Sequence, residues 1–264
     1  MAPGEFTPAF VVFSRVFIGA LVLVPLAAKR GVLKGALPYL KYIILYAIIE
    51  LVGPWYFITN GEKQISSGLA SLLIATVPFW STLFASFLGD KSVWHHKRLL
   101  GMIAAFLGVT FIVGLESLNG KNSTFAIATI LLSAAGYAIA PIAVMRKLPD
   151  IDGVAVNGLA MVFAAIVYLP FATMQFPTHT PSAKAIWSLL ALGIFPTATA
   201  FVIFFIVMKD FGPTRTSMVA YVATAIAVLL GILLLDEKWT LGIKIGLPLV
   251  IIGSYFASRK ESIP

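Results

Sequence analysis

The chain has 264 residues, of which 59% are hydrophobic and 11% are charged, and its formal net charge is +8. A soluble domain carries roughly 25% charged residues, so this composition excludes a water-soluble globule and indicates a polytopic membrane protein. Cysteine is absent, which excludes disulfides and thiolate chemistry, and the three histidines lie in polar connections, so we expect no metal and no cofactor.

Apolar runs of about 17–23 residues follow one another along the sequence, and each is long enough to cross a bilayer. They lie near residues 9–28, 40–60, 68–88, 98–115, 125–145, 154–174, 186–208, 216–235 and 241–257. A segment inside lipid must satisfy its own backbone polar groups, and the runs lack the alternation of barrel strands. The sequence therefore predicts an all-α fold with nine transmembrane helices.

Lysine and arginine are distributed unequally over the two ends of these spans. The connections after the first, third, fifth and seventh spans and the C-terminal tail hold thirteen of them, the opposite connections hold five, and Arg15 lies inside a span. The positive-inside rule predicts a multi-pass protein of the cell membrane, inner or plasma, with a cytoplasmic C-terminus. The same rule explains the positive net charge, so we expect no nucleic-acid partner.

Several residues recur at a nearly constant spacing. Pro25 matches Pro170, Gly101 matches Gly246 and Gly108 matches Gly253 at 145 residues, and Asp90 matches Asp236 and Lys63 matches Lys209 at 146. The pitch divides the chain into a first repeat, residues 1–116 with four spans, and a second, residues 117–264 with five. The partner of the fifth span, 125–145, falls before Met1, so the first repeat lacks its opening helix. Two five-helix units in tandem have opposite topology because five is odd, which predicts an inverted repeat.

Short motifs in a fixed order carry a family resemblance across nearly the whole chain. They are Phe13-Ser14-Arg15, the segment 68–73 with Pro78, Gly89-Asp90-Lys91 and Leu107-Gly108 in the first repeat, and Asp236-Glu237-Lys238-Trp239-Thr240, Gly246 and Ile251-Ile252-Gly253 in the second. With these motifs the chain resembles the EamA-type permeases of the drug/metabolite transporter superfamily. It departs from the pattern in the missing first helix and in Thr224, which stands where the first repeat has Pro78.

The resemblance implies ten helices in two inverted five-helix repeats, with a substrate cavity between the repeats. It also implies transport of amino acids, related metabolites or drugs. The missing helix is expected to line one wall of that cavity.

Glu50 and Arg15 are the charged residues within the predicted spans that we rank first as site residues. Glu50 lies about ten residues into its span, close to the bilayer midplane at about 1.5 Å rise per residue. A carboxylate there costs about 3 kcal/mol, so it is expected to face the bundle interior. Glu50 either binds substrate or exchanges a proton, or it forms an ion pair or another polar contact that stabilises the fold. Arg15 lies within about 5 Å of the same depth and either pairs with Glu50, snorkels outward or meets an anionic substrate.

Aromatic and hydroxyl residues within the spans provide further candidates for the wall of a substrate cavity. They are Trp55, Tyr56, Tyr137, Thr199 and Tyr221. For the aromatic side chains the alternative is the aromatic belt at the membrane surface. Small residues recur along 101–108 (Gly101, Ala105, Gly108) and along 242–253 (Gly242, Gly246, Gly253), and we call these two stripes the small-residue seams. They either form a homodimer interface or pack within one chain.

These features predict a secondary transporter that moves a small metabolite through the bilayer by alternating access. The energy source is then a substrate gradient or a proton gradient. No phosphate-binding or hydrolase motif is complete, so we expect no enzyme. Two alternatives stay open: an intramembrane enzyme, which needs convergent catalytic groups, and a non-transporting sensor or scaffold, which fits a chain without the first helix.

Overall fold

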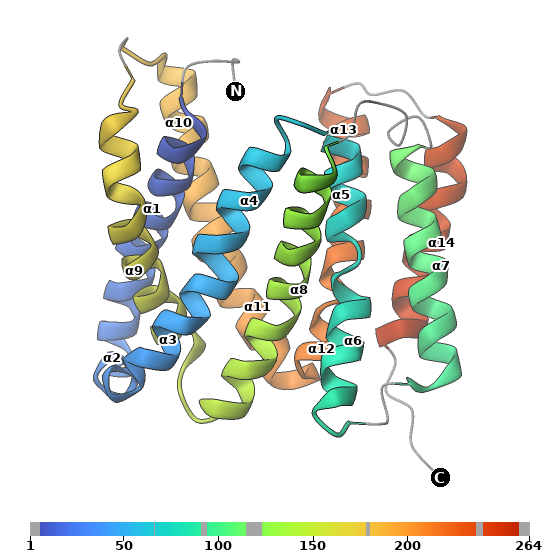
Figure 1. Ribbon diagram of the computed structural model, residues 1–264, viewed down its shortest axis with the longest axis horizontal. Coiled ribbons are helices and arrows are strands. Elements are labelled where there is room, and N and C mark those ends of the chain that lie inside the picture. The colour runs from blue at the N-terminus through green and yellow to red at the C-terminus, as the bar shows by residue number, and fades with distance from the viewer. Residues whose placement is uncertain are drawn as a thin grey trace. The chain divides into compact units, whose positions relative to one another are not determined.

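The computed structural model describes residues 6–65, 67–90, 94–114, 123–177, 180–235 and 240–258, and every regular element in these ranges is a helix (Figure 1). Eight of these helical stretches are long and apolar enough to cross a membrane, and a shorter apolar helix covers Leu241–Ala257. The prediction of an all-α polytopic membrane protein is confirmed, and the count of nine spans stays a prediction. Lys91 and the motif residues 236–239 lie outside the described ranges.

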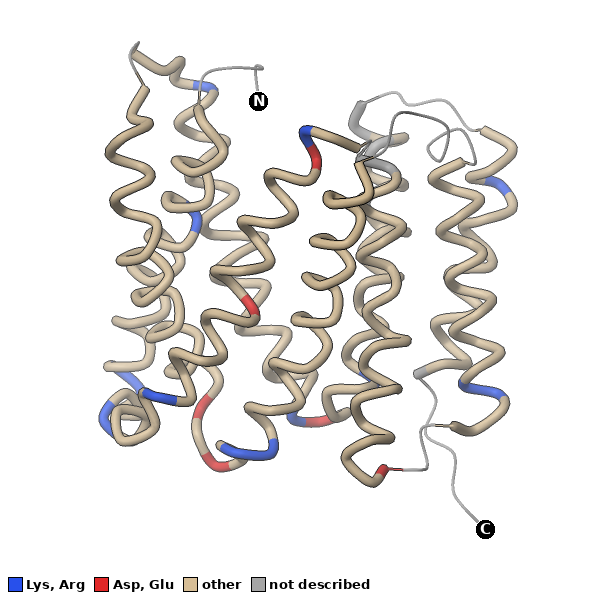
Figure 2. The backbone as a smooth tube through the Cα atoms, viewed as in Figure 1, with Lys and Arg blue, Asp and Glu red and all other residues tan. Residues whose placement is uncertain are grey.

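Charged residues lie mostly at the ends of the described helices, and few lie in the middle of a helix (Figure 2). This distribution is the one that a bilayer imposes, because a charge in the hydrocarbon region is costly. Side chains cap the first turn of several described helices. Thr7, Ser123, Asp152, Ser182 and Thr240 accept hydrogen bonds from the backbone N–H groups of Phe10, Ala126, Val154, Ala185 and Ile243, respectively.

The helices form two compact units, one from Met1–Thr59 and Ala143–Asp210 and the other from Asn60–Ile142 and Phe211–Pro264. Each unit draws residues from both predicted repeats, so the compact units do not follow the repeat boundary. The division into repeats at residue 116 therefore stays a prediction.

The first unit contains two long interrupted spans and two continuous ones. Its elements are α1 (Pro8–Lys29), α2 (Leu33–Ala36), a 3₁₀ turn (Leu37–Tyr39), α3 (Leu40–Ala47), a π-helical segment (Ile48–Val52), α4 (Gly53–Gly61), α9 (Gly153–Met174), α10 (Ala183–Gly193), a second π-helical segment (Ile194–Thr199) and α11 (Ala200–Phe211). The second span begins at Leu33 rather than near Leu40. Pro38 lacks a backbone N–H, which accounts for the 3₁₀ turn between α2 and α3.

Helices α1 and α9 pack along each other in antiparallel fashion. A Cβ on Gly19 of α1 would collide with Sδ of Met161, and a Cβ on Gly158 of α9 would lie 3.3 Å from the backbone of Leu23. The close approach therefore depends on the two glycines, as is common where membrane helices pack.

The second unit has a comparable close pair. Its elements are α5 (Ser67–Ile74), α6 (Val77–Phe87), α7 (His96–Val113), most of α8 (Thr124–Lys147), α12 (Pro213–Thr216), α13 (Val219–Leu235) and α14 (Leu241–Ser258). Helices α7 and α14 run antiparallel: a Cβ on Gly101 would lie 2.7 Å from the Gly253 carbonyl oxygen, and one on Gly108 would lie 2.7 Å from that of Gly246. The two small-residue seams therefore pack against each other within the chain.

Candidate functional site

Two π-helical segments interrupt spans of the first unit, Ile48–Val52 between α3 and α4 and Ile194–Thr199 between α10 and α11. Pro54 follows the first segment and Pro196 lies in the second. A proline cannot donate to the carbonyl four residues earlier and its ring clashes with it, so a regular α-helix cannot continue. Segments of this kind are frequent at functional sites in helical proteins.

Thr197 compensates for the proline beside it. Pro196 leaves the carbonyl of Leu192 without its usual donor, and the Thr197 hydroxyl donates to that carbonyl at 2.8 Å. Its oxygen also accepts a hydrogen bond from Nε of Arg15 at 3.2 Å. Thr197 is fully buried, so the hydroxyl is held in one orientation by these two bonds.

Arg15 brings three segments of the first unit together. Besides its bond to Thr197, its guanidinium carbon lies 4.3 Å from the ring centroid of Trp55 on α4. A cation stacked on an aromatic ring gains about 0.5–2 kcal/mol, with the larger value where water is excluded. Trp55 is buried, which favours the larger value. Arg15 on α1, Trp55 on α4 and Thr197 between α10 and α11 form what we call the arginine cluster.

Glu50 lies in the first π-helical segment, next to the arginine cluster in sequence but not paired with it. The side chain is 6% exposed, and its Oε2 has no hydrogen-bond partner. Among the described residues the ion pair found is Arg30 with Asp152 at 3.9 Å, so the alternative in which Arg15 pairs with Glu50 is not observed. A buried carboxylate oxygen without a partner costs free energy unless the group binds a proton, a cation or a ligand.

A second set of buried polar contacts holds α9 against these segments. The Tyr46 hydroxyl donates to Oδ1 of Asn157 at 3.1 Å, and the Asn157 amide donates to the Gly153 carbonyl at 2.8 Å. The Tyr168 hydroxyl donates to the Val52 carbonyl at 2.7 Å, at the end of the first π-helical segment. These contacts fix the backbone beside Glu50.

The sequence did not single out Thr197 or these three contacts among its site residues. The available signals were a hydroxyl directly after a proline at Thr197 and an amide within an apolar run at Asn157. A polar residue at membrane depth is expected to have a partner, but its partner depends on which helices meet.

The structure distributes the remaining predicted residues over both units. Tyr56 is 54% exposed and Thr199 is also exposed, both in the first unit. Tyr137 belongs to the second unit, where it packs beside Val77 and the alanines of α8. Tyr221 lies in the core of the same unit, fully buried, and its hydroxyl has no hydrogen-bond partner. The structure thus brings Arg15 and Trp55 into contact and places Glu50 on the segment before α4.

Apolar helices of membrane-spanning length, with charges at their ends and a few buried polar groups, define a multi-pass membrane protein. The model of the EamA-like transporter family matches residues 1–114 and 124–259. The chain belongs to this family.

Similar proteins are named as transporters. The chain is 28% identical over 255 residues to "Uncharacterized transporter YoaV" of Bacillus subtilis, covering 93% of this chain and 87% of that protein. It is 29% identical over 206 residues to an "Uncharacterized transporter" of Archaeoglobus fulgidus, covering 78% and 72%. A solved crystal structure has the same fold, with a TM-score of 0.81 at 19% identity, covering 97% of this chain and 88% of that one. These names support a membrane transporter.

Proposed function

We propose that the chain is a secondary transporter that moves a small metabolite, an amino acid, a related compound or a drug, by alternating access of two inverted repeats. The arginine cluster beside two interrupted spans is the observation that carries this proposal. Cation–π stacking and a buried hydroxyl hold the guanidinium in place within a membrane domain. A charged group held in one orientation at membrane depth is more typical of substrate recognition than of helix packing.

Reciprocal contacts support the inverted arrangement. Gly101 meets Gly253 and Gly108 meets Gly246, and the 145-residue shift exchanges these two contacts. A two-fold axis produces such exchanged pairs, and an axis in the membrane plane makes the two helices antiparallel, as α7 and α14 are.

Where α1 packs against α9, residues one repeat spacing apart also lie together. An apolar groove there is lined by Phe17 with Val162, Ala20 with Ala165, Leu21 with Ile166 and Val24 with Leu169, each pair 145 residues apart. From the lengths of the apolar runs and the distribution of lysine and arginine we also propose nine spans with the C-terminus in the cytoplasm of the cell.

The two π-helical segments lie in equivalent spans of the proposed repeats, the second span of the four-span first repeat and the third span of the five-span second repeat. Because their helical hydrogen bonding is already interrupted, bending there breaks fewer bonds than bending a regular helix. We therefore assign them as the hinges of alternating access, with Glu50 on one of them as the group that takes up and releases a proton.

Glu50→Gln is expected to remove transport driven by a pH gradient. The measurement is uptake of a panel of radiolabelled amino acids into proteoliposomes with and without an imposed pH gradient. We expect gradient-driven accumulation to fall by about tenfold or more, because an amide of the same shape cannot exchange a proton, while counterflow of substrate continues. Glu62→Gln is the matched control, since Glu62 lies just beyond the same span.

Equal gradient-driven accumulation by the wild type and Glu50→Gln would remove the proton role of Glu50. If no solute of the panel enters above empty liposomes while the protein is folded, the sensor or scaffold interpretation gains support.

Lys63 and Lys209 test the inverted topology directly, because they are repeat partners at a spacing of 146 residues and both side chains are exposed. The chain has no cysteine, so each lysine can be replaced singly by cysteine. In intact cells we expect a membrane-impermeant maleimide to label Lys63→Cys, and to label Lys209→Cys only after permeabilisation. Labelling of both from the same side would contradict the inverted repeat.

A further inference from the structure

The connection from the end of α1 to the start of α3, residues 29–41, is strongly basic. It holds four cations and no carboxylate: Lys29, Arg30, Lys34 and Lys41. Figure 2 shows them as blue segments around α2. Other connections rich in cations also contain aspartate: 90–98, 146–152 and 209–215. The positive-inside rule accounts for cations at this end of the spans, so the connection needs further observations before it indicates a partner.

The backbone holds this connection in a defined turn. Gly31 has a φ of 71°, and the N–H groups of Gly31 and Val32 donate to the carbonyls of Ala28 and Ala27 at 3.0 and 3.1 Å. These two hydrogen bonds close the end of α1 in a Schellman motif, and α2 follows directly. The cations on the turn are therefore presented by an ordered backbone.

The length of the second span places this turn at the membrane surface. The span Leu33–Gly61 has 29 residues, whereas one crossing needs about 20. The part from Leu40 onward is by itself about long enough to cross, and Pro38 interrupts the helix just before it. Residues 33–39 are therefore expected to lie in the headgroup layer rather than in the hydrocarbon core.

Apolar side chains are exposed among the cations of this turn. Leu37 is 50% exposed, Tyr39 is 39% exposed and Leu40 is 40% exposed. A surface that combines exposed apolar and basic side chains is typical of segments that lie in the membrane interface, where the apolar groups reach the acyl boundary and the cations reach the phosphates.

Three of the four cations are available to a headgroup. Arg30 forms its ion pair with Asp152 at 3.9 Å. Lys29, Lys34 and Lys41 are exposed, and within the part of the chain that the structure describes none of them forms an ion pair. Lys41 lies 4.9 Å from the ring centroid of Tyr42, a contact that leaves its charge uncompensated.

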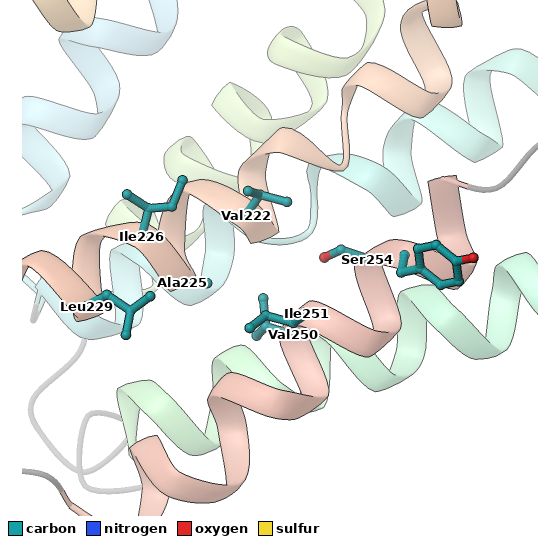
Figure 3. Close-up of a pocket in the computed structure, with 8 residues that line it drawn as sticks. Val222, Ala225, Ile226, Leu229, Val250, Ile251 and Ser254 are labelled. Atoms are coloured by element: carbon teal, nitrogen blue, oxygen red, sulfur yellow. The ribbon is translucent and has the colours of Figure 1, made fainter.

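A groove of the second unit offers a contrast. It has a volume of about 330 Å³, lies between α13 and α14, and is lined by apolar side chains such as Val222 and Leu229 and by the Ser254 hydroxyl (Figure 3). Its lining residues include no charged side chain. Such a surface suits acyl chains of any lipid, whereas recognition of a charged headgroup needs cations like those of residues 29–41.

We propose that residues 29–41 bind the headgroup of an anionic phospholipid, with Lys29, Lys34 and Lys41 around its phosphate and Leu37 at the acyl boundary. The cytoplasmic leaflet is rich in such lipids, and each cation near its surface raises the binding constant about fivefold. The choice of leaflet rests on the topology proposed above, and the binding itself does not. The surface lies about 20 Å along α1 from Arg15, so it is distinct from the arginine cluster.

Quenching by brominated lipids tests this surface in the full chain. Gly35→Cys places one thiol in α2 for a bimane fluorophore, where an added Cβ meets no heavy atom within 4 Å, and the chain has no other cysteine. The vesicles are phosphatidylcholine with a minor share of phosphatidylglycerol, and bromine is carried on the acyl chains of one lipid or the other. We expect phosphatidylglycerol to be enriched beside the label by about tenfold over its bulk share.

Three sets of substitutions in the Gly35→Cys chain test the role of the lysines. Glutamine at Lys29, Lys34 and Lys41 together should abolish the enrichment, and arginine at the same positions should preserve it. The charge-matched control has glutamine at three exposed lysines elsewhere and should also preserve it: Lys63, Lys184 and Lys209.

Equal quenching by the two lipids would overturn the proposal, because both headgroups carry a phosphate and only phosphatidylglycerol carries a net charge. Equal loss of enrichment in the glutamine variant and in its control would also overturn it, in favour of a general effect of net charge. Quenching needs no turnover and both leaflets contain both lipids, so the result does not depend on transport or topology. Enrichment without transport would count against the proposed function alone.

Discussion

Alanine at Gly108 is expected to destabilise the second unit strongly. A Cβ at this position would lie 2.7 Å from the Gly246 carbonyl oxygen, 2.7 Å from the Val250 nitrogen and 2.8 Å from Cγ2 of Val250. Two of these atoms are backbone, so α7 and α14 must separate along the seam. Overpacking of this kind costs about 1–3 kcal/mol, and more where backbone must move. We expect a clear drop in melting temperature and in monodisperse yield, measured by thermal unfolding in detergent.

Gly35→Ala is the matched control for Gly108→Ala. A Cβ on Gly35, in α2, meets no heavy atom within 4 Å. Alanine in a helix is favoured over glycine by roughly 0.5–1 kcal/mol, so this variant should melt at the wild-type temperature or slightly above. If Gly108→Ala melts like Gly35→Ala, the close packing of α7 on α14 is not what stabilises the second unit.

Arg15→Gln is expected to reduce transport by at least about tenfold, which corresponds to about 1.4 kcal/mol. Glutamine keeps a hydrogen-bond donor but loses the charge that stacks on Trp55 at 4.3 Å. Arg15→Lys should restore only part of the activity, because an ammonium group lacks the planar donor set that both stacks on Trp55 and bonds to Thr197. The measurement is the initial rate of uptake into proteoliposomes of the solute that the wild type transports.

The control for Arg15 is Arg30→Gln. Arg30 lies at the end of α1, and its ion pair with Asp152 is solvent-exposed and 3.9 Å long, so its loss should change transport and stability little. Melting temperatures of all three variants separate a folding defect from a transport defect. Uptake by Arg15→Gln at the rate of Arg30→Gln would show that the arginine cluster has no part in transport.

Most of the span positions followed from the sequence because a bilayer of fixed thickness requires about 20 apolar residues for each crossing. The expected run 154–174 corresponds to the helix Gly153–Met174, and 125–145 to Thr124–Lys147. The π-helical segments could not be predicted in the same way. The sequence shows Pro54 and Pro196, but a kink, a turn and a π-helical segment all relieve a proline within a helix.

The partner of Arg15 shows why the candidate site was only partly predictable. Depth along a helix follows from the rise per residue, and on that basis Arg15 is predicted to lie within about 5 Å of the depth of Glu50. Rotation about the helix axis does not follow from it, and a π-helical segment before α4 changes that rotation. Trp55, five residues after Glu50, therefore faces Arg15, and Thr197 reaches it from a segment 182 residues away.

The sequence by itself determined the class of protein, the approximate spans and the family, because composition, hydrophobic length and motif order depend little on the contacts between helices. It also located the small-residue seams at 101–108 and 242–253. Only the tertiary structure decided that these seams pack against each other, that Arg15 contacts Trp55 and Thr197, and that Oε2 of Glu50 has no partner. Each of these depends on the rotation and mutual approach of helices far apart in the chain, which van der Waals packing and buried hydrogen bonds determine.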